Sequence, residues 1–85
     1  MSTREEAIQE LRTRALRSER LARASRAVAR EFRSEYAACF PQGQPAHMEA
    51  LALRPFVIVE EQEAKVHDQD AAFFRGLIDL IGNQE

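Results

Sequence analysis

The sequence has few of the residues that mark disulfide-stapled or membrane-spanning proteins. Its 85 residues include one cysteine, three glycines, three prolines and no tryptophan. Because Cys39 is alone, no disulfide can form within the chain, which excludes a disulfide-stapled secreted scaffold and favours a reducing, cytoplasmic location. Apolar runs such as Phe56 to Val59 are far shorter than the roughly 20 residues that cross a bilayer. We therefore expect no membrane partner.

The sequence also lacks any recognisable catalytic or metal-binding motif. Neither HExxH nor CxxC occurs, no calcium loop is present, and the three glycines are too dispersed for a phosphate-binding loop. We expect no catalytic residue, no metal and no cofactor, and a thiol-dependent or metal-dependent small enzyme is the least favoured alternative. The side chains considered for such a site are Cys39, His47, Glu49, His67, Asp68 and Asp70.

What the chain does contain is a balance of apolar and charged residues, typical of a folded domain. Hydrophobic residues make up 45% of the sequence and charged residues 31%. We expect a single domain over residues 1–85. A chain of this length buries only about 60 to 65% of the surface that it exposes when unfolded. Its stability is therefore marginal, and homodimerisation would add to it.

The charges are distributed unevenly between the two halves of the chain. Residues 1–40 contain nine arginines and six glutamates, whereas residues 41–85 contain three basic and eight acidic residues. The halves should attract each other. The imbalance is greatest between Leu11 and Arg33, where eight arginines are accompanied by two acids.

The first half predicts one long amphipathic helix over residues 3–39. No glycine or proline occurs before Pro41, and Glu5 and Glu6 lie in the first turn, where carboxylates favour the helix dipole. Apolar and small residues recur at alternating steps of three and four, which is the spacing of a heptad seam. The seam comprises Ile8, Leu11, Ala15, Ser18, Ala22, Ser25, Ala29, Phe32, Tyr36 and Cys39.

Residues 40–45 predict a turn, because they contain Pro41, Gly43 and Pro45. Residues 46–53 then form a short helix or a strand, which Arg54 and Pro55 are expected to close. The run from Phe56 to Val59 fits either a buried strand or a helix that begins at Pro55. If it is helical, a second row of three-and-four spacing follows, through Val59, Glu63, Val66, Asp70, Phe73, Leu77 and Leu80.

A terminal helix is expected to complete the C-terminal part, residues 46–82. Asp68 or Asp70 is suited to cap it, and Gly82 followed by Asn83 is a typical end. Phe74, Leu77, Ile78 and Ile81 share one face of it. The expected fold is therefore mainly α, with the terminal helix packed back on the long first helix and a possible short strand at 56–59. The residues predicted to form the core or a dimer interface are Leu11, Leu21, Val28, Phe32, Tyr36, Leu77 and Ile81.

Two features predict a partner-binding function. Arginines cluster on one face of the first helix, where they can pair with carboxylates or phosphates, and apolar residues of the second half are left over to dock a partner. We expect a small adaptor, regulator or accessory subunit that dimerises through its long helix and binds another protein with an acidic or apolar surface. Nucleic-acid binding is a less favoured alternative, because the chain is net acidic and no aromatic residue lies among the arginines. The predicted partner-binding residues are Arg20, Arg23, Arg26, Arg30, Arg33, Phe56, Ile58 and Phe73.

Overall fold

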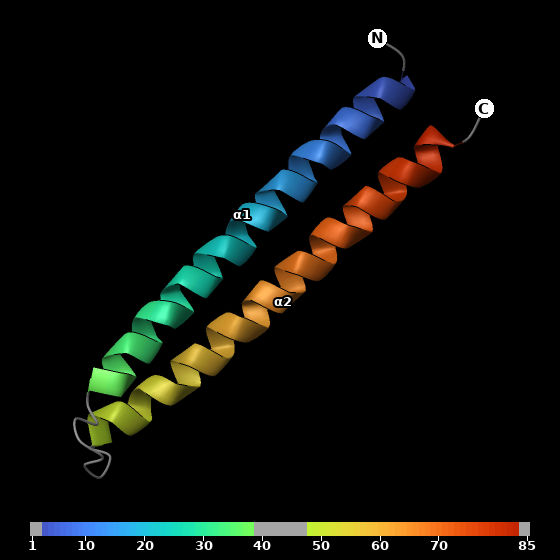
Figure 1. Ribbon diagram of the computed structural model, residues 1–85. Helices are drawn as coiled ribbons and strands as arrows, with labels where there is room; N and C mark the ends of the chain where they lie inside the picture. The colour runs from blue at the N-terminus through green and yellow to red at the C-terminus, as the bar shows by residue number, and fades with distance from the viewer. Residues whose placement is uncertain (1–2, 39–47, 84–85) are drawn as a thin grey trace.

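The protein is a hairpin of two long antiparallel helices (Figure 1). The computed structural model describes residues 3–38 and 48–83, which form α1 (Thr3–Ala38) and α2 (Met48–Gly82). The hairpin is a rod with principal extents of 63 × 17 × 17 Å. The prediction of a mainly α fold is confirmed. The predicted turn at 40–45, Cys39 and His47 lie outside the described residues.

The first helix follows the sequence prediction closely. It begins at Thr3 and ends at Ala38, without interruption. Its buried residues are five successive members of the predicted heptad seam, Ala15, Ser18, Ala22, Ser25 and Ala29. The seam members on either side of this buried stretch are half-buried; they are Ile8, Leu11, Phe32 and Tyr36.

The second helix meets this seam with a matching row of its own. Val57, Ala64 and Ala71 are its buried apolar residues, each seven positions from the next. Between and beyond them lie half-buried side chains at steps of three and four: Glu60, His67, Phe74, Ile78 and Ile81. Small side chains on both helices let the backbones approach closely. At the end of the hairpin where α1 finishes, Phe32 and Phe56 stack with ring centroids 5.4 Å apart.

The expectation that Arg54 and Pro55 close a short helix is wrong, because α2 continues through Pro55. The residues from Phe56 to Val59 are therefore helical, and the described part of the chain contains no strand. Proline costs a helix one backbone hydrogen bond and a steric clash. Here its ring is exposed to solvent, while burial of Val57 and the stacking of Phe56 on α1 hold the following turn in helical conformation.

The ends of α2 give one confirmation and one correction. Asp68 and Asp70 lie in the middle of α2, so neither caps a helix. The predicted end at Gly82 is confirmed, and the amide of Asn83 donates to the carbonyl of Asp79 at 3.0 Å. The guanidinium of Arg4 donates to the carbonyl of Gly82 at 2.8 Å, which ties the start of α1 to the end of α2.

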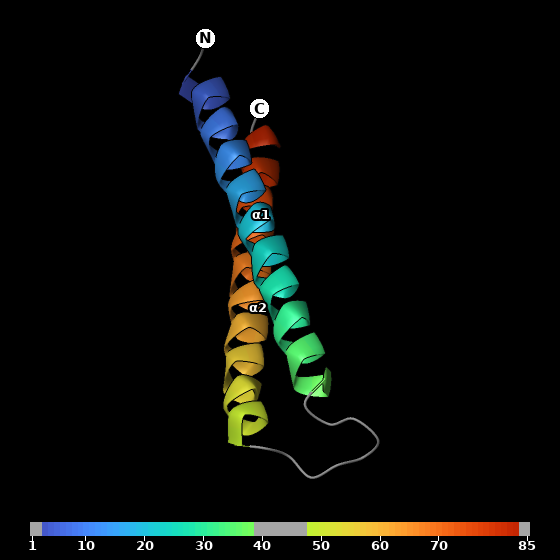
Figure 2. The same cartoon turned by 90° about the vertical axis from the view of Figure 1, so that its left-hand side faces the viewer.

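The core between the helices is thin. In the described residues no large side chain is fully buried, and alanines make up most of the buried apolar residues. Figure 2 shows the two helices lying against each other at a slant. Each helix therefore buries only one narrow stripe of its surface against the other. Since hydrophobic stabilisation scales with the apolar area removed from water, this seam alone stabilises the hairpin weakly.

Replacing a seam alanine with a larger residue should force the helices apart. Ala22 is 1% exposed, so Ala22→Leu has no room for the added methyl and methylene groups. We expect a loss of about 1–3 kcal/mol in the free energy of unfolding, the usual result of overpacking. Urea unfolding followed by circular dichroism at 222 nm measures it. Ala24→Leu is the matched control, because Ala24 is exposed on the same helix and its replacement should change stability little.

Candidate protein-interaction surface

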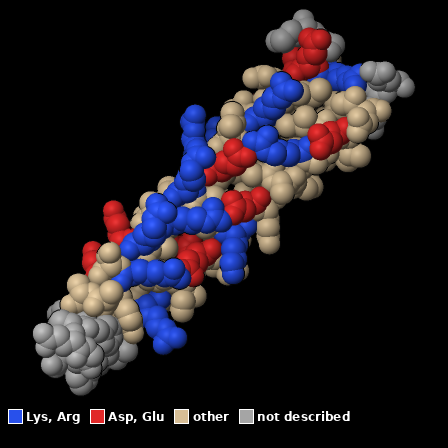
Figure 3. Space-filling model, in the orientation of Figure 1, with Lys and Arg blue, Asp and Glu red and all other residues tan. Residues whose placement is uncertain are grey.

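Three ion pairs join the helices along one flank of the hairpin. Their α1 members are Glu19, Arg26 and Arg33, and their α2 partners are Arg75, Asp68 and Glu61. The members on each helix are seven residues apart, so all three pairs lie on the same side of the seam. Figure 3 shows basic and acidic side chains meeting along the line between the helices.

These pairs determine how the two helices are aligned, but they contribute little to the stability of the hairpin. The participating side chains are 31–62% exposed, and ion pairs in contact with water contribute little and are screened by salt. Two of the three pairs join an arginine of α1 to an acid of α2, which is where the uneven charge of the sequence is used. Sliding α2 along α1 would break all three pairs at once.

The pKa of Asp68 reports on this flank. Hydrogen bonding from Arg26 lowers the pKa of the Asp68 carboxyl, and its own desolvation opposes that shift in part. The charges of Arg26 and His67 lower it further. The same hydrogen bond raises the pKa of Arg26. The charged forms of both residues are therefore favoured in the folded hairpin.

The outer side of α2 carries an uncovered apolar row. Val59, Val66, Phe73 and Leu80 are 51%, 46%, 62% and 63% exposed. They are seven residues apart, so they lie on one side of the helix, and at 1.5 Å per residue the row is about 32 Å long. We call these four residues the outer row. Exposed apolar residues that recur along one side of a helix are typical of an interaction site.

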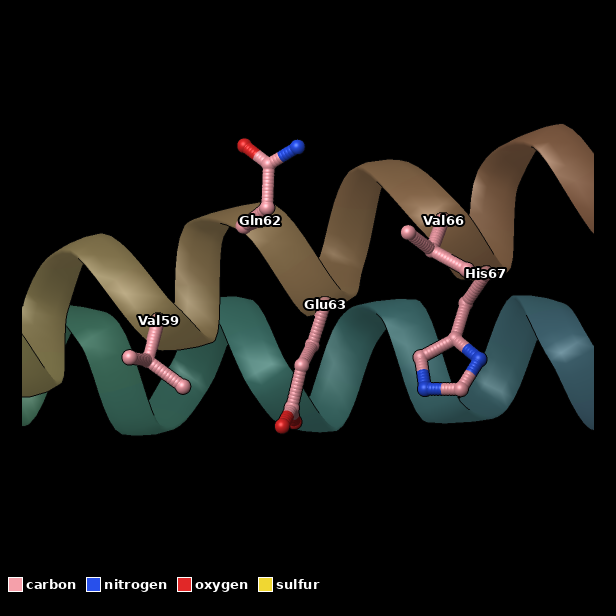
Figure 4. Close-up of a pocket in the computed structure, with 5 residues that line it drawn as sticks. All are labelled: Val59, Gln62, Glu63, Val66 and His67. Carbon is pink, nitrogen blue, oxygen red and sulfur yellow. The ribbon is translucent and has the colours of Figure 1, made fainter.

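A shallow pocket lies at the end of the outer row nearer the interhelical connection. Its lining residues are Val59, Gln62, Glu63, Val66 and His67. In the view of Figure 4, Val59, Glu63 and His67 point to the side of α2 on which α1 is drawn, whereas Gln62 points to the opposite side. The pocket is therefore a hollow along the side of α2, with an apolar floor and one carboxylate at its edge.

The stripe next to the outer row is uncharged. It comprises Pro55, Gln62, Gln69 and Gly76, all exposed and again seven residues apart. The outward face of α1 is different, since Arg20, Arg23 and Arg30 are exposed there and Leu16 is an isolated apolar residue at 50% exposure. Only α2 therefore offers a long surface that a partner could cover without removing many charges from water.

The predicted site residues fall into separate parts of the molecule. Of the five arginines, Arg26 and Arg33 are engaged in interhelical ion pairs, and the other three are exposed on α1. The three predicted apolar contacts on α2 are all exposed: Phe56 at 55%, Ile58 at 58% and Phe73 at 62%. Most of the predicted core or dimer residues are half-buried, namely Leu11, Val28, Phe32, Tyr36, Leu77 and Ile81, whereas Leu21 is 44% exposed.

The sequence prediction of partner-binding residues omitted most of the outer row. Val59, Val66 and Leu80 belonged to the second row of three-and-four spacing, and the sequence also allowed a second apolar side through Phe73 and Leu80 as a docking surface. The row does not face α1, because Val57, Ala64 and Ala71 take that position. The signal that identifies the row is its seven-residue spacing, which Phe73 shares with the other three members.

Low pH should remove the contribution of Asp68 to the stability of the folded hairpin. Because its folded-state pKa is lowered, the stabilisation is present above the unfolded-state pKa of about 3.9 and is lost as the pH falls through the lower, folded-state value. We expect Asp68→Asn to lower the thermal midpoint at pH 7, and the gap from wild type to close between pH 4 and pH 2. Asp79→Asn is the control, since Asp79 makes no ion pair with the described residues. A gap that persisted at pH 2 would contradict this account.

The described helices contain no group of three or more His, Cys, Asp or Glu side chains placed to hold a metal ion. Neither α1 nor α2 includes a segment long and apolar enough to cross a membrane. The function proposed below rests on the geometry of the hairpin alone. The chain matches no known family model, no curated protein and no solved structure.

Proposed function

We propose that this chain is a non-enzymatic protein-binding adaptor or accessory subunit, and that the outer row of α2 is its docking surface. The observation that carries the proposal is the row itself: Val59, Val66, Phe73 and Leu80 stand at heptad spacing with about half of each side chain exposed. A row of apolar residues repeated every seven positions supplies one of the two apolar positions by which a heptad packs against another helix. The occupant that suits the row best is therefore a helix.

The packing of the two helices leaves the outer side of α2 available for contact with a partner. The apolar seam of α1, which the sequence suggested as a dimer interface, lies against α2 of the same chain. The opposite side of α1 is rich in exposed arginines. A partner, whether a second copy or another protein, would therefore meet the molecule on α2.

The energetics of the hairpin support the same proposal. Burying a Val, Leu or Phe side chain completely contributes about 1.5–3 kcal/mol. Covering the exposed half of four such side chains would contribute roughly 3–6 kcal/mol, before the entropic cost of association is subtracted. For a hairpin whose seam is mostly alanine, a gain of this size is comparable with the stability of a small domain.

Nucleic-acid binding is the second candidate, favoured by the exposure of Arg20, Arg23 and Arg30 on one face of α1. Three guanidinium groups on a helix can contact phosphates. The pairing of Arg26 and Arg33 with acids of α2 reduces the positive charge of that face, which favours the protein-binding proposal.

The docking surface can be tested by affinity capture from the native host. We expect the wild-type chain to retain a protein partner, and Phe73→Ser combined with Leu80→Ser to reduce its recovery at least about tenfold, since both substitutions remove apolar contact area. Leu16→Ser is the control, because Leu16 is a large apolar residue that is 50% exposed but lies on α1. Circular dichroism verifies that each variant is helical. Equal recovery by all three chains would refute the proposal.

Salt dependence separates the two candidates. Binding that neutralises phosphates weakens linearly in log affinity against log salt, whereas an apolar interface responds little. We expect no binding to a 20-base-pair DNA duplex or a single-stranded RNA at 50 mM salt, measured by fluorescence anisotropy. Tight binding with a steep salt slope that Arg20→Gln, Arg23→Gln and Arg30→Gln together abolish would establish the second candidate instead.

A further inference from the structure

Two carboxylates border the outer row. Glu63 and Asp70 are exposed and seven residues apart, and each lies within one helical turn of two members of the row. Neither forms an ion pair with any residue in the described helices, in contrast to Glu61 and Asp68 on the other flank of α2. Asp70 shares a hollow with Arg14 and Arg17 of α1, but neither guanidinium pairs with it, so both carboxylates are free of direct ion pairs within the described hairpin.

These carboxylates restrict what can cover the row. A purely apolar partner would take both charges out of water without compensation, which is unfavourable. A second copy fits less well, because pairing the row with itself gathers four carboxylates in one interface, and although Arg14 and Arg17 share a hollow with Asp70, no lysine or arginine lines the pocket that contains Glu63. A partner that brings its own cations removes the penalty and gains charge-assisted hydrogen bonds.

Gly76 is a second, independent indication that a partner helix covers this side of α2. It lies well inside α2, where glycine destabilises a helix relative to alanine, and it is exposed. Apart from its own turn of helix, a Cβ added at this position would meet no atom within 4 Å, so the packing of α1 does not require glycine here. Its place between Phe73 and Leu80 suits close approach of a second helix backbone.

Resting on the proposed function, we infer that the outer row binds an amphipathic helix of a different protein that carries two lysines or arginines seven residues apart. The apolar stripe of that helix covers the outer row. Its two cations lie opposite Glu63 and Asp70, and its backbone passes closest to α2 at Gly76.

Two synthetic peptides test the charge requirement. Both are 28-residue helices with leucine at heptad positions, and they differ only in a pair of flanking residues seven positions apart, lysine in one and glutamate in the other. Sedimentation must first show that each is monomeric at the concentration used. We expect the full-length chain to bind the lysine peptide at least about tenfold more tightly than the glutamate peptide, measured by isothermal titration calorimetry. Glu63→Gln with Asp70→Asn should remove this preference, and Glu63→Lys with Asp70→Lys should reverse it.

Substitutions at Gly76 test the close approach of the partner helix separately from the folding of the free chain. Gly76→Ala should raise the thermal midpoint of the free chain, because alanine favours helix and the added methyl group meets open space. Gly76→Leu should weaken binding of the lysine peptide at least about fivefold while the chain stays helical. Ala24→Leu is the control for an added leucine on a surface away from the row.

The outcomes distinguish this inference from the proposed function. Equal affinity for the two peptides, lost in Phe73→Ser with Leu80→Ser, would overturn the requirement for cations and leave the docking surface in place. A free chain that sediments as two copies, dissociates when Phe73 is replaced by Ser and binds neither peptide would show that a second copy occupies the row. A stable monomer that binds neither peptide would also overturn the inference, and the affinity capture then decides on the proposed function by itself.

Discussion

The structure depends on close contact between two stripes of small side chains. Ala15, Ala22 and Ala29 on α1 face the α2 row that includes Ala64 and Ala71. Small residues bring helix backbones near each other, but they remove little apolar area from water. The alignment of the helices is therefore assisted by contacts outside the stripe, namely the ion pairs along one flank, the stacked phenylalanines at one end and the bond from Arg4 at the other.

This constraint places the larger apolar residues of α2 on the outside. The inward row of α2 contains two alanines and one valine at its buried positions, whereas the outer row contains two valines, a phenylalanine and a leucine. In a chain stable by itself the larger side chains would be expected inside. The thin core and the exposed outer row are thus one property of the molecule, and a partner helix on α2 would complete a layered helical bundle.

The sequence predicted the structure of α1 better than that of α2. For α1 the absence of glycine and proline and the unbroken three-and-four spacing predicted the length and the seam, and both are confirmed. For α2 local preferences conflicted, because Pro55 and the β-branched run after it signal an end and a strand. Packing of Val57 and Phe56 against α1 outweighs those preferences, and this long-range contact could not be derived from the sequence of α2. Phe56, Ile58 and Phe73 are exposed as predicted, but only Phe73 belongs to the outer row, and Phe56 stacks on Phe32 of α1.

The sequence by itself determined that the chain is mainly helical, that its two halves differ in charge, and that α1 has one apolar stripe. It did not determine which side of α2 would meet that stripe, because α2 carries two heptad rows of equal regularity, one through Val57, Ala64 and Ala71 and the other through Val59, Val66, Phe73 and Leu80. Tertiary structure decided between them. Against the alanines and serines of α1 only the row with small side chains allows close packing, since phenylalanine and leucine would hold the helices apart, and so the larger row is left facing outward.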